Sequence, residues 1–311
     1  MLFALPLNAN SRAKKIKAIK SGQQGLCPAC MQEVYSRCGK SRIKHWAHFP
    51  NCNCVVQWKP ETPWHRQWKS EFPYEWQEVV LHDEKTGEKH VADVKLPTNL
   101  VLEFQHSSIS EGELQSRNNF YKNLFWVVDA RSSFHDLFNE MQHAGNFVKA
   151  KRKIKAVPLV PIQGCYVINY PEKVFPKRWL HCTVPVIFDM SGKEDSSDDN
   201  VETLDKIKTL NPKISDFYTS ILFIRQTLWL LLPRVNQQDP VFALAIHRND
   251  FVETLRSKGN IFAPRVTQVS LPVRSRISSI GRKQLPEVGS FSALRRAILS
   301  SSKPVPRKFH L

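Results

Sequence analysis

The stretch His90-Val-Ala-Asp-Val-Lys-Leu-Pro-Thr-Asn-Leu-Val-Leu-Glu-Phe-Gln105 decides the fold, because it predicts two strands joined by a tight turn. Residues 91–96 and 100–105 are mostly apolar, and Pro97-Thr98-Asn99 between them is typical of a turn. Side chains alternate between the two faces of a strand, so Glu103 lies on the face opposite to its apolar neighbours. Asp93 on the first strand is then expected to meet Glu103 across the hairpin.

Two converging carboxylates suggest a metal site. They repel each other, and a divalent cation with a preference for oxygen ligands, Mg²⁺ or Mn²⁺, relieves that repulsion. The alternative interpretation is that Asp93 and Glu103 are ordinary solvated strand positions. The hairpin alone does not decide between the two.

Length and charge narrow the class of protein. A chain of 311 residues favours two domains, and its net charge of +17 favours a polyanionic partner, above all DNA. The most apolar segment, 221–232, is too short to span a bilayer and contains Arg225, so no contact with a membrane is expected.

The cysteines predict a structural zinc site. Cys27-Pro-Ala-Cys30 supplies two thiolates, and His48 and Cys54 are the first choice for the other two ligands, with His45 and Cys52 as alternatives. A set of unrelated reduced cysteines is the competing interpretation. The odd total of seven cysteines favours metal binding in a reducing compartment over a disulfide framework, and hence a cytoplasmic protein.

Two helices are predicted on either side of the hairpin in the chain. The first begins at Pro63 after the N-cap Thr62, and places His65 and Lys69 on one face within reach of Glu61. A solvated face is the alternative for these residues. The second is predicted to begin after Ser110 and carries Arg117 and Tyr121 four residues apart, before a buried parallel strand at 124–129. The order helix, strand, hairpin, helix, strand is typical of an α/β layer with a mixed sheet.

These motifs together resemble the competence protein CoiA family over roughly the first 140 residues. That family is similar to the PD-(D/E)xK nuclease superfamily, which has a restriction-endonuclease-like fold. The features that carry the resemblance, in chain order, are Cys27-Pro-Ala-Cys30, His45-Trp-Ala-His48 with Cys54, the helix with Glu61, His65 and Lys69, Ala92-Asp93-Val94, Leu102-Glu103-Phe-Gln105, and Arg117-x-x-x-Tyr121.

The resemblance implies a metal-dependent phosphodiester hydrolase. Asp93 and Glu103 would hold Mg²⁺ or Mn²⁺, with Glu61 as a further ligand. Gln105 stands where the superfamily usually has a Lys, so it would orient the attacking water without supplying a charge. The remaining residues are expected to act as follows: His65 or Lys69 would assist the water or contact a phosphate, and Arg117 and Tyr121 would bind the substrate.

The second half of the chain carries fewer signals. A basic run at 149–155 marks a boundary, an acidic loop is expected at 191–200, and residues 258–311 form a basic tail in which Glu287 is the one acidic residue. The tail is either a solvated segment or a phosphate-binding arm. Strands are predicted at 157–170 and 184–190, and helices at 201–210, 212–232 and 241–257.

The sequence therefore predicts three parts and one activity. A zinc-binding module at 1–58 precedes a restriction-endonuclease-like mixed sheet flanked by helices at 59–148, and a mixed, mostly helical basic region follows at 149–311. The expected protein is an Mg-dependent deoxyribonuclease acting in DNA uptake, recombination or defence. The alternative is a DNA-binding or scaffolding protein that keeps the fold without cleavage. A partner protein or self-association is compatible with either.

Overall fold

The computed structural model describes residues 1–9, 14–40, 43–56, 58, 61–84, 86–142, 146–149, 158–191, 223–233 and 241–263. The chain divides into two compact units, Met1–Asp129 and Ala130–Leu311, so the predicted boundary at residue 148 falls inside the second unit. Most of the basic run, nearly all of the acidic loop, the helix predicted at 201–210 and the tail beyond residue 263 lie outside the described residues.

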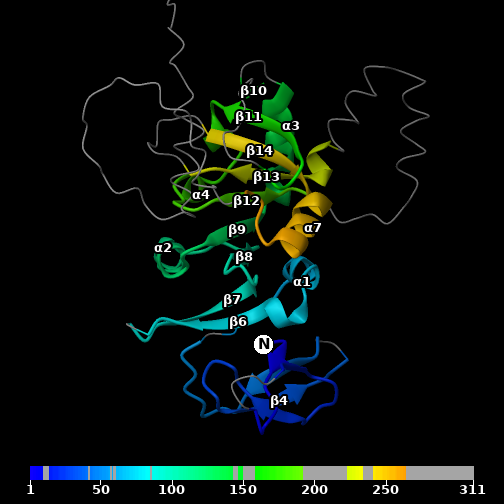
Figure 1. Cartoon of the computed structure of the whole chain (residues 1–311), viewed down its shortest axis with the longest axis vertical. Coiled ribbons are helices and arrows are strands. Elements are labelled where there is room, and N and C mark those ends of the chain that lie inside the picture. The colour runs from blue at the N-terminus through cyan, green and yellow to red at the C-terminus, as the bar shows by residue number, and fades with distance from the viewer. Residues whose placement is uncertain are drawn as a thin grey trace, which may run out of the picture. The chain divides into compact units, whose positions relative to one another are not determined.

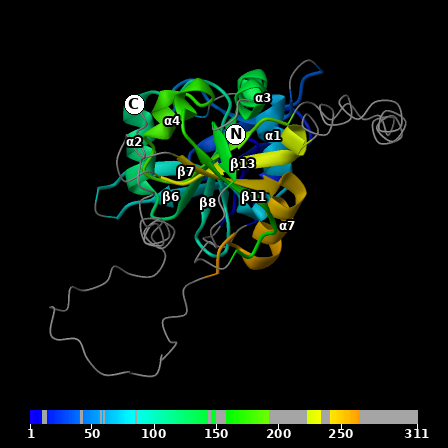
Figure 2. The same cartoon turned by 90° about the horizontal axis from the view of Figure 1, so that it is seen from above.

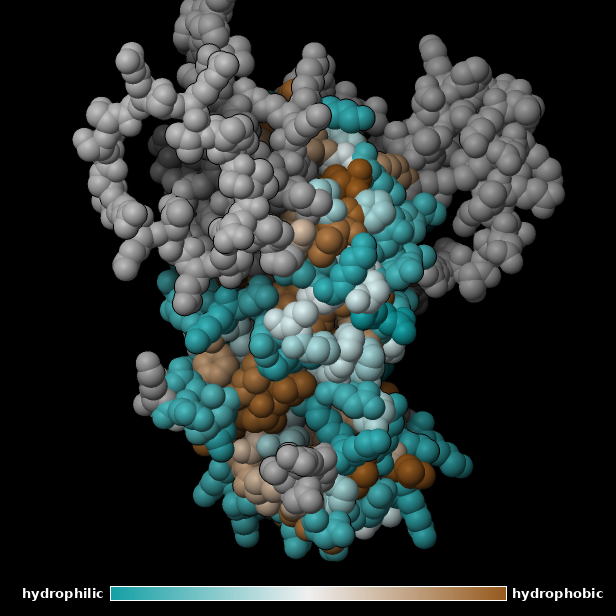
Figure 3. Space-filling view, viewed as in Figure 1, coloured by the Kyte–Doolittle hydropathy of each residue, from teal (hydrophilic) through white to brown (hydrophobic). Residues whose placement is uncertain are grey.

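The first unit begins with a small all-β module. Strands β3, β4 and β5 form an antiparallel sheet, and β1 pairs with β2 beside it. Trp46 and Val34 are 1% and 0% exposed and pack against Cys27 in the core of this module. The surface of this module that is visible in Figure 3 is largely hydrophilic, with some hydrophobic patches. The strands are β1 Phe3–Ala4, β2 Ile16–Lys17, β3 Gln24–Leu26, β4 Glu33–Arg37 and β5 His45–His48.

A mixed sheet follows, in which the strands of the first unit are hydrogen-bonded in the order β6-β7-β8-β9. The predicted hairpin is present: β7 and β8 are antiparallel with Val94 opposite Leu102, and Asn99 in the turn has a φ of 64°. The predicted parallel strand is present too, since β9 runs parallel to β8. A 3₁₀ turn at Tyr74–Trp76 leads into β6. The strands are β6 Gln77–His82, β7 Lys89–Lys95, β8 Val101–Gln105 and β9 Leu124–Asp129.

Helices α1 (Pro63–Ser70) and α2 (Glu111–Phe120) lie on opposite sides of this sheet in Figures 1 and 2. Both begin as predicted, because the hydroxyls of Thr62 and Ser110 accept hydrogen bonds from backbone N–H groups in the first turn. The α1 side of the sheet is aromatic: Trp68 stacks on Phe104 of β8 at 5.6 Å between ring centroids. That packing fixes α1 on the central hairpin.

Glu78 links the N-terminal module to the mixed sheet. It has a left-handed φ of 47°, and its carboxylate accepts hydrogen bonds from the backbone N–H groups of Leu2 and Phe3. The Lys15 ammonium donates to the carbonyl of Glu78 at 3.2 Å, and Lys89 on β7 donates to the carbonyl of Ala29 at 3.2 Å. Several polar contacts therefore join module and sheet within the first unit.

The second unit is built on an antiparallel sheet in the order β10-β11-β14-β13-β12. The prediction of a mostly helical C-terminal region is therefore wrong for its described residues. The elements are α3 Phe134–Gln142, β10 Phe147–Lys149, β11 Ile162–Ile168, α4 Lys177–Leu180, β12 Val186–Asp189, β13 Thr227–Leu231, β14 Val241–His247 and α7 Arg248–Lys258.

Two predicted helices contain strands instead. The segment predicted as a helix up to residue 232 ends in β13, in which every residue is buried. The segment predicted as a helix from Val241 begins with β14, and helix starts only at Arg248. A central strand is apolar on both faces, so its sequence lacks the alternation that would distinguish it from a buried helix. No helix among the described residues has the length and apolar character to cross a membrane.

Candidate functional site

An acidic cluster forms where α1 meets the hairpin. Glu61 precedes the helix, His65 lies in its first turn and Asp93 lies on β7; one ligand atom from each comes within 4.8 Å of the others. His65 Nε2 is 3.0 Å from Asp93 Oδ2, which also accepts a hydrogen bond from the backbone N–H of Phe104 at 2.9 Å. Helix and hairpin thus converge on Asp93.

Charge compensation keeps Asp93 ionised. Burial would raise the pKa of this carboxyl, but His65, Lys69 and the Phe104 N–H bring the pKa down to about 2. The reciprocal effect acts on the imidazole: burial lowers the pKa of His65, and the charge of Asp93 outweighs it, so the pKa is raised. The pair is an ion pair over the range between the two pKa values.

Glu103 occupies the strand position opposite Asp93, as the register of Val94 with Leu102 requires, but it lies outside the group defined above. Its carboxylate is 3% exposed; Oε2 accepts from Arg117 of α2 at 2.7 Å, whereas Oε1 is buried without a hydrogen bond. Burial and then the charge of Asp93 raise the pKa of Glu103 to about 8, although Arg117 opposes the shift. Glu103 is therefore an incompletely compensated carboxylate.

Arg117 and Tyr121, the predicted substrate-binding pair, are both held at Glu103. Arg117 donates to Glu103 at 2.7 Å and to Glu113 at 3.4 Å. Tyr121 is 4% exposed, and burial followed by the charge of Glu103 raises the pKa of its hydroxyl. In this arrangement the pair faces the carboxylate on the α2 side of the sheet.

Lys69 is enclosed rather than open to solvent. Its side chain is 1% exposed, and its ammonium lies 2.7 Å from Glu61 and 2.9 Å from Glu78. Burial lowers the pKa of Lys69, but Glu78 and then Glu61 outweigh it, so the pKa is raised above its ordinary value. The geometry makes Lys69 a positioning group for Glu61. Gln105 also makes an internal contact, because its amide donates to the carbonyl of Ser107 at 2.7 Å.

Sequence reasoning missed Glu78 and a second carboxylate–imidazole pair. Glu78 stands opposite Asp93 between the paired positions Gln77–Val94 and Val79–Ala92, and a charge next to the apolar run 79–81 was the available signal. His106 Nδ1 lies 2.5 Å from Asp129 Oδ2 where the parallel strands β8 and β9 end. No local pattern connects two residues so far apart in the chain.

The predicted zinc ligands come together in the N-terminal module. Cys27, Cys30, His48 and Cys54 place their ligand atoms within 4.8 Å of one another. Of the alternatives, Cys52 lies 4.0 Å from Cys30, sulfur to sulfur, while His45 contacts the carbonyl of Ile43.

Three thiols and an imidazole are a donor set that suits tetrahedral Zn²⁺. The backbone N–H of Ala29 donates to the Cys27 sulfur at 3.4 Å, and the chain turns after Cys30 with a left-handed φ of 59° at Met31. Burial raises the pKa of Cys27 to about 12, so a bound cation would be needed to keep this thiolate at neutral pH. The cluster could hold structural zinc.

Comparison with known proteins gives one positive result. Residues 8–57 match the family described as "Competence protein CoiA, N-terminal domain". Neither the curated proteins nor the solved structures contain a significant match. The matched segment includes all four residues of the Cys27, Cys30, His48 and Cys54 cluster. The match supports the CoiA-like resemblance and links the chain to competence.

Proposed function

We propose that this protein is a metal-dependent DNA nuclease whose centre lies at Asp93 and Glu103. The observation that carries the proposal is the placement of a half-buried carboxylate, Asp93, opposite a buried one, Glu103, on one hairpin. One oxygen of Glu103 has no hydrogen bond. Oxygen donors of this kind fit Mg²⁺ or Mn²⁺. The net charge of +17 is consistent with a polyanionic substrate.

Asp93 and Glu103 would hold the metal, and Glu61 would complete the oxygen donors. When bound, the cation lowers the pKa of a water and neutralises charge on the scissile phosphate. The chain's own residues prepare this site. The His65 imidazole and the Phe104 N–H fix the Asp93 carboxylate, and Lys69 fixes that of Glu61.

Three further groups have roles that do not involve ligation of Mg²⁺ or Mn²⁺. Once its amide leaves the Ser107 carbonyl, Gln105 can orient a water by accepting or donating a hydrogen bond. Arg117 can transfer part of its fork from Glu103 to a phosphate, which the planar guanidinium binds well. The N-terminal Cys27, Cys30, His48 and Cys54 would bind one structural Zn²⁺.

Cleavage assays test the proposal. Purified protein is incubated with linear, circular and single-stranded DNA, with and without Mg²⁺ or Mn²⁺. We expect metal-dependent cleavage that Asp93→Asn and Glu103→Gln abolish, while DNA affinity stays largely intact. The control is Glu111→Gln, which neutralises an exposed carboxylate in the first turn of α2 and should leave cleavage unchanged. Full activity in both hairpin variants would overturn the assignment.

A DNA-binding protein without cleavage is the second candidate. Two observations favour it: Gln105 stands at the position of the usual Lys, and Arg117 already occupies one oxygen of Glu103. This candidate predicts salt-sensitive DNA binding and intact substrate under every metal condition. Any metal-dependent cleavage that is lost in Asp93→Asn would exclude it.

A further inference from the structure

A basic cleft of about 530 Å³ lies between the N-terminal module and α1, within the first unit. Its volume falls in the range of roughly 300–1,000 Å³ that is typical of ligand sites. The module contributes Phe3, Lys17 and Lys44, and the segment from α1 to the start of β6 contributes Arg66, Phe72 and Tyr74. None of these residues belongs to the acidic cluster or to the zinc ligands.

The cations of the cleft are available to an anion. Lys17 and Lys44 are exposed, and the described residues that line the cleft include no carboxylate. The Arg66 guanidinium uses one nitrogen, Nη1, on the Glu61 carbonyl at 2.5 Å. Lys15, by contrast, is committed to the carbonyls of Gln77 and Glu78. Within the basic segment, Lys15 thus has a structural role, whereas Lys17 faces the cleft.

Aromatic rings lie next to these cations. The Lys17 ammonium sits 5.8 Å from the centroid of the Phe3 ring, and that ring is 6.2 Å from the ring of Tyr74. Phe3 and Phe72 are buried and form the apolar wall, whereas Tyr74 is only partly buried and can offer its ring to a ligand. Cations beside an accessible ring are the combination by which proteins bind the backbone and bases of a single strand.

We infer that this cleft binds a segment of single-stranded nucleic acid, with phosphates on Lys17, Lys44 and Arg66 and a base against Tyr74. The inference rests on the proposed function, for which it supplies a strand-binding surface. Arg66 follows His65 directly on α1, so a strand in the cleft would run along the helix that contributes His65 to the acidic cluster. Successive helical residues differ by about 100° in direction, which separates the two surfaces on one helix.

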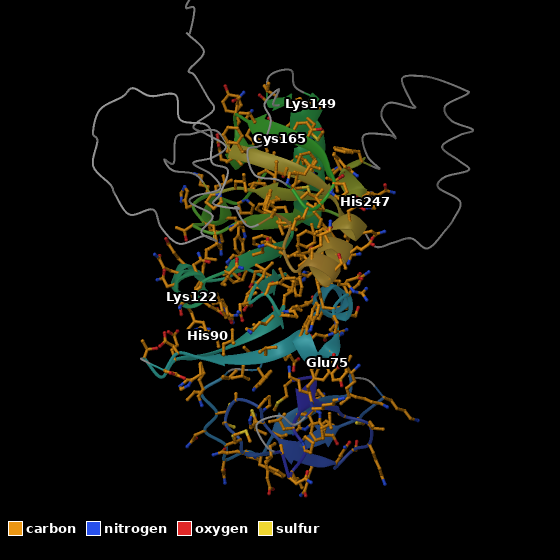
Figure 4. All side chains as sticks on the ribbon, in the orientation of Figure 1. Glu75, His90, Lys122, Lys149, Cys165 and His247 are labelled. Carbon is orange, nitrogen blue, oxygen red and sulfur yellow. The ribbon has the colours of Figure 1, made fainter. Side chains whose placement is uncertain are left out.

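The test measures binding of an oligothymidylate of about 15 nucleotides, with no added Mg²⁺ or Mn²⁺, as a function of salt. The variant Lys17→Ala/Lys44→Ala removes two exposed charges and leaves α1 untouched. Its charge-matched control is Lys40→Ala/Lys122→Ala, in which both lysines are also exposed. In Figure 4 Lys122 lies at the left, near α2, whereas Glu75, the neighbour of Tyr74, lies at the lower right, below α1.

We expect the salt slope of the cleft variant to fall by about 1.4, because each phosphate contact to a single strand contributes roughly 0.7. A fourfold rise in salt should then weaken this variant about sevenfold less than the wild type, and the control should match the wild type. Tyr74→Leu, which keeps an apolar side chain against Phe3, should weaken binding about tenfold. Ultraviolet crosslinking should attach the oligothymidylate to the peptide that contains Tyr74.

Three results would overturn the inference: equal slopes for the cleft variant and its control, unchanged binding by Tyr74→Leu, or preference for a duplex of the same length. Competition by thymidine monophosphate or inorganic phosphate as strong as by the oligonucleotide would show a free-anion site and also overturn it. These outcomes are separate from the fate of the nuclease proposal. Cleavage lost in Asp93→Asn supports that proposal even if the cleft fails, and strand binding at the cleft stands even if nothing is cut.

Discussion

Replacing Lys69 by methionine should destabilise the first unit by about 3 kcal/mol. The change removes two charge-assisted hydrogen bonds, at 2.7 Å to Glu61 and 2.9 Å to Glu78, each worth about 1.5–3 kcal/mol. Removing one partner of a buried ion pair costs roughly 3–5 kcal/mol. The lower end applies because Glu61 is 14% exposed and Glu78 retains hydrogen bonds from Leu2 and Phe3.

The expected loss should not depend on pH near neutrality. The folded-state pKa of Lys69 is raised above its ordinary value of 10.5, so its contribution is fully present below 10.5 and is lost only as the pH rises through the folded-state pKa. Urea unfolding between about pH 6 and pH 9 should therefore give the same difference. Fluorescence of Trp64 and Trp68, on the same helix, provides the signal.

Two further variants make the test decisive. Lys122→Met, at an exposed position, should change the free energy of unfolding by no more than about 0.5 kcal/mol. Adding Glu78→Gln to Lys69→Met should recover part of the lost stability, because it removes one of the two negative charges that Lys69→Met leaves without a positive partner. A loss below about 1 kcal/mol for Lys69→Met, with the denaturant dependence unchanged, would refute the enclosed ion pair.

Three other predictions concern the zinc cluster, Asp93 and the basic tail. Elemental analysis of the purified protein should find about one Zn²⁺ per chain. Cys27→Ser should lose the zinc and unfold the N-terminal module, whereas the control Cys38→Ser, outside the cluster, should retain it. Folded protein without zinc would contradict this prediction. The pKa of Asp93 is lowered from 3.8 to about 2, so this carboxylate should stabilise the folded state by roughly 2 kcal/mol above pH 3.8 and lose that contribution as the pH falls toward 2. Acid unfolding of Asp93→Asn should lack this loss. Identical acid-unfolding curves for the wild type and Asp93→Asn would argue against the prediction. Removal of residues 264–311 should weaken DNA binding and reduce the salt dependence of that binding without changing which bond is cut. Gel-shift assays measure the binding, and cleavage mapping identifies the bond. An unchanged salt dependence would mean that the tail is only a solvated segment.

The truncation point illustrates how structure sharpens a sequence-based design. A cut after Ser257 follows from charge density alone. Ile261 and Phe262 beyond it are 0% and 6% exposed, and the carbonyl of Ile261 accepts a hydrogen bond from Leu159. A chain ending at residue 263 removes the basic tail and keeps that contact, so the binding assay would not be confounded by misfolding.

Local signals in the first unit were sufficient to predict its central hairpin, the starts of both helices and the parallel strand. The turn at Pro97-Thr98-Asn99 and the N-caps Thr62 and Ser110 act over a few residues, and the structure contains each of them. Spacing also brought Cys27 and Cys30 into one cluster with the predicted His48 and Cys54. Short-range chemistry therefore accounts for these features of the unit.

Long-range pairing explains what the sequence could not reveal. Strands β13 and β14 are buried on both faces, so burial removed the alternation that marks a strand. The enclosure of Lys69 depends on Glu78, nine residues away on another element. Helical spacing alone predicted only that Lys69 shares a face with His65 and lies within reach of Glu61. The ion pair of Arg117 with Glu103 likewise joins a helix to a strand, and no local sequence pattern predicts it.

The hydrogen bonds of Glu78 have a practical consequence for dissecting the chain. A fragment beginning at residue 59 would remove the Leu2 and Phe3 donors and leave a 3%-exposed carboxylate with Lys69 alone. It would also uncover Val80, which packs against the core of the N-terminal module. Inactivity of such a fragment would result from the lost contacts between the N-terminal module and the sheet rather than from a missing catalytic group. A fragment intended for enzymology or crystallisation should therefore begin at Met1 rather than at residue 59.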